Sequence, residues 1–271
     1  MSNKDGEVDT SGKSGVKEII ILPRDRTIIR EIDRWRICQG RHIIDLVGFT
    51  GERACNKRLQ KLVQAGYITR EKILYGVAGI LRVTTKGRKL EGLPIRKNKI
   101  RIEQIRHDIA VLDTAIYFNK VFGIAYLDMR TELELHRADG FGVRKHRPDF
   151  IFKMNEKTTC VEIELTLKSK SRFEKNISTN FMDYDKQIWI VPDLECKIAK
   201  ILRNSQQMYT DIEIIELNQI QQAHKNQEWI LQETAPQSPI NQTLVSQETL
   251  LQQQENQAKS QIQEPPNCDL F

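Results

Sequence analysis

Three carboxylates lie close together along the chain in a setting that suits metal chemistry. Asp149 follows Pro148 at the start of an apolar run, and Glu162 and Glu164 are two residues apart within residues 159–165. Side chains alternate along a β-strand, so Glu162 and Glu164 are expected on one face. Carboxylate oxygens on adjacent strands suit Mg²⁺ or Mn²⁺, which can polarise a phosphodiester and lower the pKa of a bound water. The spacing therefore predicts a divalent-metal site for phosphodiester hydrolysis.

Two basic residues near these carboxylates suit the same chemistry. A cation beside the reacting phosphate would stabilise the negative charge that develops on it, and Lys168 and Arg147 are the candidates. The pattern also has ordinary explanations. Glu-x-Glu is common on the solvent face of an amphipathic edge strand, and Pro-Asp often opens a turn. A nuclease-like domain that binds DNA without cutting it is an intermediate interpretation.

A second group of residues suits contact with DNA. Residues 50–65 predict a helix that Thr50 caps, with an apolar stripe formed by Ala54, Leu59, Leu62 and Val63. Its outward face is polar and mostly basic. The early positions of such a helix meet base edges, where Arg suits guanine and Asn suits adenine. The candidate base contacts are Arg53, Asn56 and Lys57, and the candidate phosphate contacts are Lys61, Arg82 and Arg147.

The elements around this basic helix predict a winged helix-turn-helix over residues 16–95. Residues 27–37 and 43–47 have helical spacing of apolar side chains, and Gly48 ends the second run. After the basic helix, residues 67–74 and 80–85 have strand character and flank a Gly-rich turn. Helix, helix, basic helix, strand, turn and strand is the order of that motif. Winged helices also bind proteins, and an exposed basic face can simply be solvated, so both alternatives stand beside DNA binding.

The carboxylates belong to a second predicted module, residues 96–217. A helix is expected over 107–118, strands over 124–135, 159–165 and 187–192, and a basic helix from 169 to 176. The fold class is therefore mixed, α+β or α/β. The two ends of the chain, residues 1–15 and the Gln/Asn-rich residues 218–271, have too few apolar side chains to offset the entropy of ordering, and both are expected to be disordered.

Composition narrows the class of protein. The 271 residues carry 42 Lys and Arg against 36 Asp and Glu, a net charge of +6. Residues 16–106 hold about 22 Lys and Arg against 9 Asp and Glu, so this part carries roughly +13 and the remainder is acidic. The sequence shows neither an apolar run of about 18–20 residues nor a secretory signal, so membrane insertion is not expected. Its five cysteines never form a C-x-x-C pair, which favours a reducing, cytoplasmic location over disulfides or zinc.

The acidic motif resembles the PD-(D/E)xK nuclease superfamily. Pro148-Asp149 stands as its first element and Glu162-Ile163-Glu164 as its second, with Glu164 where a Lys is usual. Over residues 16–195 the order of motifs is similar to the replication-relaxation family, which includes the MOBC-type conjugative relaxases. Its further motifs here are a Thr-Thr-Lys-Gly run after the hairpin, and His107-Asp108. The resemblance implies a restriction-endonuclease-like mixed sheet with Asp149, Glu162 and Glu164 as metal and catalytic carboxylates. It also implies Glu134 as a fourth metal ligand and a role of unknown kind for His107.

Three functions follow from these expectations. The first is a metal-dependent relaxase of a plasmid or integrative element, which binds double-stranded DNA at an origin of transfer or replication and nicks one strand. A conjugation coupling protein or other relaxosome proteins would be its partners. The alternative is a non-enzymatic DNA-binding accessory or regulatory protein built on a degenerate nuclease fold. A host-defence or repair endonuclease is the third, and it would differ from a relaxase in cutting with less site specificity.

Overall fold

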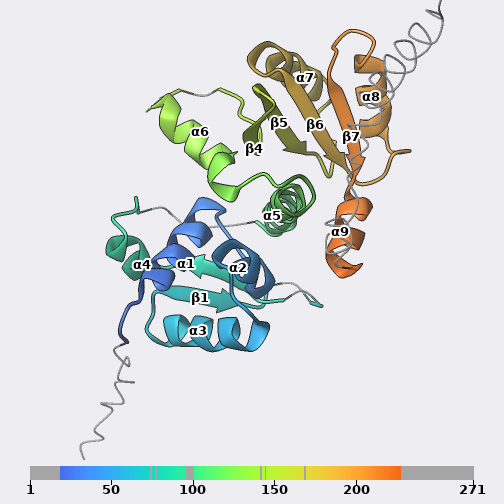
Figure 1. The fold of residues 1–271 in the computed structure, drawn as a ribbon. Coiled ribbons are helices and arrows are strands. Elements are labelled where there is room, and N and C mark those ends of the chain that lie inside the picture. The colour runs from blue at the N-terminus through green and yellow to red at the C-terminus, as the bar shows by residue number, and fades with distance from the viewer. Residues whose placement is uncertain are drawn as a thin grey trace, which may run out of the picture. The chain divides into compact units, whose positions relative to one another are not determined.

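The computed structural model describes residues 19–73, 75–76, 78–95, 101–140, 142–143, 145–167 and 169–226 (Figure 1). The expected disordered segment 1–15 and the greater part of the expected tail lie outside these residues. The first elements follow the predicted order of three helices and two strands. They are α1 (Pro23–Arg34), α2 (Gly40–Val47), α3 (Glu52–Gln64), β1 (Ile68–Glu71) and β2 (Ile80–Val83).

Apolar side chains at helical spacing hold these first elements together. Ile28, Ile29 and Ile32 of α1 are fully buried, as are Leu59 and Leu62 of α3. Burying a large aliphatic side chain stabilises a fold by roughly 1.5–3 kcal/mol, so these positions fix the packing of the helices. Strands β1 and β2 form an antiparallel hairpin, and the short helix α4 (Thr85–Leu90) follows it directly.

A mixed sheet of five strands organises the rest of the described chain. The long helix α5 (Ile102–Phe122) comes first, and a 3-10 turn, η1 (Tyr126–Asp128), leads to the sheet region. The elements that follow are β3 (Arg130–Thr131), α6 (Glu132–Asp139), β4 (Phe150–Met154), β5 (Lys157–Ile163), α7 (Lys170–Asp183), β6 (Lys186–Val191), α8 (Lys197–Ser205), β7 (Ile212–Glu216) and α9 (Leu217–Asn226). The strand order is β3-β4-β5-β6-β7. β3, β4 and β5 are antiparallel neighbours, whereas β5, β6 and β7 run parallel.

Helices cover both faces of this sheet. On one face, Phe173 and Ile177 of α7 pack with Trp189 of β6, and Leu202 of α8 joins the same buried cluster. On the other face the aromatic ring of Phe118 from α5 lies 5.4 Å from that of Phe152 on β4. Because both faces are covered, β5 and β6 are buried on both sides, as expected of central strands.

The structure corrects the strand that the sequence predicts over residues 124–135. Only Arg130 and Thr131 pair with β4, and Glu132 begins helix α6. The reason is a capping box, in which the Thr131 hydroxyl accepts from the backbone N–H of Glu134 and the Glu134 carboxylate accepts from the N–H of Thr131. Alternation of apolar and polar residues suggested a strand here, but this local capping favours the helix.

The expected start of the disordered tail at residue 218 is also corrected. Helix α9 extends to Asn226, which is also the end of the first compact unit of the chain. Ile220 and Ala223 are buried, and the His224 imidazole Nε2 lies 2.7 Å from the backbone carbonyl oxygen of Asp113 on α5. Two apolar residues at helical spacing were enough to pack this polar segment. Among the described helices, none is both long and apolar enough to cross a membrane.

Candidate functional site

Helix α3 presents one buried face and one open face. Its buried side chains are Cys55, Leu59 and Leu62, whose spacing of four and three residues forms a stripe. The helix is capped by Gly51, one residue after the expected Thr50. Ala54, expected in the apolar stripe, is exposed. The helix therefore sits slightly rotated from the prediction, with its basic residues turned outward.

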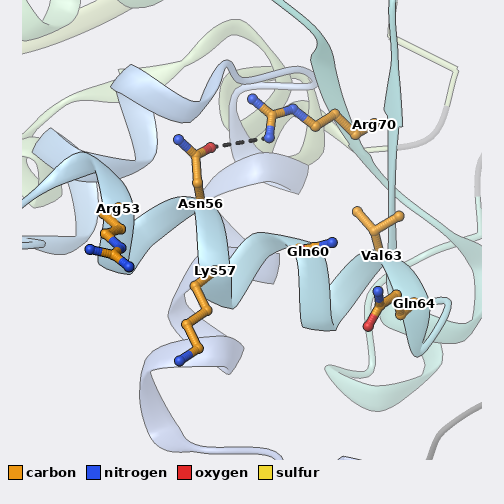
Figure 2. Close-up of a pocket in the computed structure, with 7 residues that line it drawn as sticks. All are labelled: Arg53, Asn56, Lys57, Gln60, Val63, Gln64 and Arg70. Carbon is orange, nitrogen blue, oxygen red and sulfur yellow. Dashed lines mark hydrogen bonds between the residues drawn. The ribbon is translucent and has the colours of Figure 1, made fainter.

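The residues expected to contact DNA on α3 lie together on this open face. Arg53, Lys57 and Lys61 are exposed, and Asn56 is half-buried beside them. A groove of about 750 Å³ runs along the helix (Figure 2). Its lining residues are Arg53, Asn56, Lys57, Gln60, Val63, Gln64 and Arg70. Figure 2 shows Arg53 and Lys57 projecting away from the helix, while Asn56 points toward Arg70 of β1.

The cations of α3 differ in their partners. Within the described part of the chain, Arg53, Lys57 and Lys61 make no ion pair, so their charges face solvent. Asn56 is held instead, because its Oδ1 accepts from Arg70 at 3.1 Å and its Nδ2 donates to Glu52 at 3.2 Å. A row of open cations flanked by oriented amides can bind phosphate oxygens and base edges.

Two other expected DNA contacts are engaged by carboxylates. The Arg82 side chain is largely buried, with its Nη1 3.7 Å from the Glu71 carboxylate. Arg147 makes a two-pronged ion pair with Asp139, whose Oδ2 accepts from the arginine Nε at 2.8 Å. Hydrogen bonding to Asp139 raises the pKa of Arg147 despite partial burial. These two cations are therefore less available to phosphate than the cations of α3.

The structure brings two of the predicted metal carboxylates together. The β4–β5 register begins with the pair Phe150 and Val161; Asp149 immediately precedes Phe150, and Glu162 immediately follows Val161. Just outside that pair, the Asp149 N–H donates to the Val161 carbonyl oxygen at 3.1 Å. The Asp149 carboxylate also accepts from the backbone N–H of Ile163 at 2.7 Å. Asp149 and Glu162 are thus fixed at the same point of the sheet.

Glu162 is held in the interior by two polar partners. Its Oε1 lies 2.7 Å from the imidazole Nε2 of His146 and accepts from the Asn180 amide of α7 at 2.8 Å. Burial raises the pKa of Glu162, and the charge of Asp149 adds to that rise; the hydrogen bonds offset it only in part. Burial alone would lower the pKa of His146, but the contact with Glu162 raises it overall. Both groups therefore hold their protons more tightly than isolated groups would.

His107 is the partner of Asp149, as His146 is the partner of Glu162. Its Nε2 lies 3.3 Å from Asp149 Oδ1, and its Nδ1 lies 3.4 Å from Asp108 Oδ1. Burial would lower the pKa of His107, but the charge of Asp149 and the contacts with both carboxylates raise it to about 11. The imidazolium is therefore the counter-ion of Asp149. Arg36 of the α1–α2 connection adds positive charge, with its Nη1 3.8 Å from Asp108.

The remaining predicted site residues lie apart. Glu134 of α6 is bound by Arg34 at 3.0 Å and by the capping box. Glu164 follows β5 and borders a small hollow of about 60 Å³ with Arg172 and Asn176 of α7. Lys168 lies outside the described residues. Among the residues that are described, no group of three or more His, Cys, Asp or Glu side chains has the arrangement of a metal site.

The two neighbouring carboxylates have partners within the protein. Asp149 Oδ2 accepts from the Ile163 N–H, and Glu162 Oε1 accepts from Asn180 and lies beside His146. Sequence reasoning missed His146 and Asn180 as partners of Glu162. His146 could have been found from the sequence, because it stands just before Arg147-Pro148-Asp149. Nothing in the sequence marks Asn180, which reaches Glu162 only because α7 packs on the sheet.

Comparison with known proteins adds no relative: no protein-family model matches the sequence, and no curated protein or solved structure is significantly similar to it.

Proposed function

We propose that the protein binds double-stranded DNA, with α3 as the helix that enters the major groove. The observation that carries this proposal is the row of exposed cations on α3 that make no ion pair among the described residues. Duplex DNA carries one negative charge for about every 1.7 Å of helix axis, so an open basic row gains affinity from counterion release. The order of elements around α3, with the β1–β2 hairpin after it, supports a winged helix-turn-helix.

The contacts on α3 divide into two kinds. Arg53 and Lys57, near the start of the helix, are placed for base edges, and Lys61 one turn further for a phosphate. Asn56 must exchange its bonds with Arg70 and Glu52 before it can read an adenine. Arg53 is therefore expected to contribute more sequence discrimination than Asn56.

The test is a fluorescence-anisotropy titration of a mixed-sequence duplex at several salt concentrations. The double variant Arg53→Gln/Lys57→Gln should bind the duplex more weakly at every salt concentration, because it removes two cations from the surface that meets DNA. Lys197 and Lys200 on α8 are exposed as well, so Lys197→Gln/Lys200→Gln removes the same charge elsewhere. Equal behaviour of the two double variants would show that α3 is not the DNA-binding surface.

A second candidate function is cation-dependent nicking of one DNA strand. The specific observation in its favour is that Asp149 and Glu162 lie near each other where β4 and β5 begin to pair, since the Asp149 carboxylate accepts from the N–H of Ile163, the residue after Glu162. The sheet, with an antiparallel run of three strands followed by parallel pairing, is compatible with the restriction-endonuclease-like fold that the sequence resembles. A relaxase of a mobile element, acting at an origin of transfer or replication with a coupling protein as its partner, is the detailed form of this proposal.

This second candidate is tested on supercoiled plasmid carrying the DNA that flanks the gene, with Mg²⁺ or Mn²⁺ added. Glu162→Gln keeps the size and hydrogen-bonding atoms of the side chain but removes its charge. Site-specific open-circle product that depends on the cation and disappears in this variant would support nicking. Tight binding of the plasmid without cleavage under either metal would leave the DNA-binding function alone.

A further inference from the structure

A second basic surface lies on α7, away from helix α3 in the chain. An open cleft of about 710 Å³ is bounded by α7 and by the segment before β4. Its lining residues are His136, Val143, Lys145, His146, Arg172, Lys175, Asn176 and Thr179. The α7 members are three, four and seven residues after the first, so they share one face of the helix. We call this the α7 cleft.

The α7 cleft has two open cations. Arg172 and Lys175 are exposed and, within the described residues, make no ion pair. Lys145 is bound to Asp183 at 2.7 Å, so its charge is already matched. Glu174, the acidic residue between the two cations, pairs with Lys170 and lines a different cavity. Glu164 lines a separate small hollow together with Arg172.

His146 lies at the inner wall of the cleft. Its Nε2 is taken by the buried carboxylate of Glu162, and the imidazole is still 22% exposed. Asn176 and Thr179 complete the wall with an amide and a hydroxyl, both of which donate hydrogen bonds to phosphate oxygens in protein–DNA contacts.

We propose that the α7 cleft is a second nucleic-acid-binding surface, which takes the phosphodiester backbone of a strand through Arg172, Lys175 and the donors beside them. The choice of nucleic acid as the ligand rests on the proposed function of α3, but the cleft does not need α3 to bind. From residue 172 to residue 179 a helix rises about 10 Å, the axial length of roughly three nucleotides of one strand. The strand would pass over His146, which separates it from the buried Glu162.

The experiment measures binding of a mixed-sequence oligonucleotide, as a single strand and as the duplex of the same sequence. The cleft variant Arg172→Gln/Lys175→Gln is compared with wild type, with the α3 variant Arg53→Gln/Lys57→Gln, and with Lys197→Gln/Lys200→Gln on α8. All six positions are exposed, so the variants should fold, which equal thermal midpoints would verify. The cleft variant should bind its preferred probe roughly tenfold more weakly at 0.1 M salt, with a salt slope lower by about 1.4 for the single strand or about 1.8 for the duplex.

The outcomes separate this proposal from that for α3. A cleft variant that binds both probes like wild type overturns the proposal for the α7 cleft and does not affect the function proposed for α3. Loss in the cleft variant with none in the α3 variant supports the cleft and overturns the function proposed for α3. A wild-type protein that binds neither probe overturns both. If a polyglutamate peptide of equal charge competes for the cleft as effectively as DNA does, the cleft would be assigned to an acidic protein partner, which also overturns the proposal.

Discussion

The open face of α3 and the carboxylate region around Asp149 both gather charged side chains, but they use charge differently. On α3, Arg53, Lys57 and Lys61 face solvent without an ion pair among the described residues. Around Asp149 the charges are matched inside the protein, with His107 beside Asp149 and His146 beside Glu162. A row of charged side chains without ion-pair partners is available to a ligand, whereas an ion pair within the protein mainly holds the packed elements in place.

The same difference limits what a count of charges can show. The excess of Lys and Arg over residues 16–106 suggested a strongly basic module. Several of these cations are neutralised by acids from later in the chain. Arg34 binds Glu134, Arg36 binds Glu132 and Arg41 binds Asp113. The available positive charge of the first part is therefore smaller than its composition indicates, and Arg53, Lys57 and Lys61 of α3 are among the cations that stay open.

The largest expected effect contrasts two cations of α3 itself. Arg58 is bound to Asp25, a fully buried carboxylate of α1, whereas Arg53 is open. Arg58→Gln should lower the free energy of unfolding by about 3 kcal/mol, because it leaves a buried charge without its partner. Arg53→Gln should change it by less than about 0.5 kcal/mol. Urea unfolding measures both; equal losses would mean that the open and matched cations of α3 do not differ as described.

A smaller effect concerns pH and the matched pair between α2 and α5. His42 is buried, accepts from the Gln39 N–H through Nδ1 at 3.1 Å and lies 2.9 Å from Asp113 through Nε2. Burial lowers the pKa of His42 despite the contact with Asp113. The unfolded chain therefore takes up a proton near pH 6.5 that the folded protein resists. Stability from this group is fully present above pH 6.5 and is lost as the pH falls toward the lowered folded pKa.

The measurement compares wild type with His42→Gln by urea unfolding between pH 7 and pH 5. Within the window below pH 6.5 the wild type should lose about 1.4 kcal/mol per pH unit relative to the variant. Burial would raise the pKa of the neighbouring Asp113, but its bonds with His42 and Arg41 lower that pKa overall. The stability that the Asp113 carboxylate contributes is therefore lost only below the pH at which ordinary carboxyl groups take up a proton. Parallel pH profiles of the two proteins would exclude a buried neutral His42.

Much of the fold could be predicted from local patterns. The first three helices, the hairpin, α5 and β6 fall close to their expected positions, because periodic apolar residues and glycines at the ends mark them. Gly48, with a positive φ of 70°, ends α2 as expected. The region around α6 could not be assigned from alternation alone, since the Thr131 and Glu134 capping box overrides it. Helix α9 was missed because only Ile220 and Ala223 anchor it.

The candidate site was predicted less completely, for a physical reason. The closeness of Asp149 and Glu162 follows from their places on adjacent strands, which the sequence indicates. Whether a charge is open or matched depends on partners from distant segments, such as Asp139 for Arg147 or Asn180 for Glu162. No local spacing records those contacts. Glu134, which the resemblance implies as a fourth metal ligand, is likewise held by Arg34 from the distant helix α1 and by the cap of α6.

The third prediction is that Glu134→Gln lowers the free energy of unfolding by about 1 kcal/mol. Glu134→Gln weakens the cap of α6 and the ion pair with Arg34, and the loss of a capping interaction costs about that much. Thermal unfolding should show the change, while cation-dependent plasmid nicking, where it is found, should keep its rate. Loss of nicking at unchanged stability would instead place Glu134 at a metal.

The smallest effect compares Arg82 with Arg53 in DNA binding. Both were expected to contact DNA, but Arg82 is largely buried beside Glu71 whereas Arg53 is exposed. A guanidinium already held by a carboxylate gains less from a phosphate, because it must give up that contact first. Arg82→Gln should therefore weaken duplex binding by less than about twofold, whereas Arg53→Gln should weaken it about tenfold, within the range for one base contact. Anisotropy titrations on the same duplex measure both. If Arg82→Gln weakened binding as much as Arg53→Gln, the hairpin would share the contact equally with α3, and an ion pair within the protein would be a poor guide to which cations meet DNA.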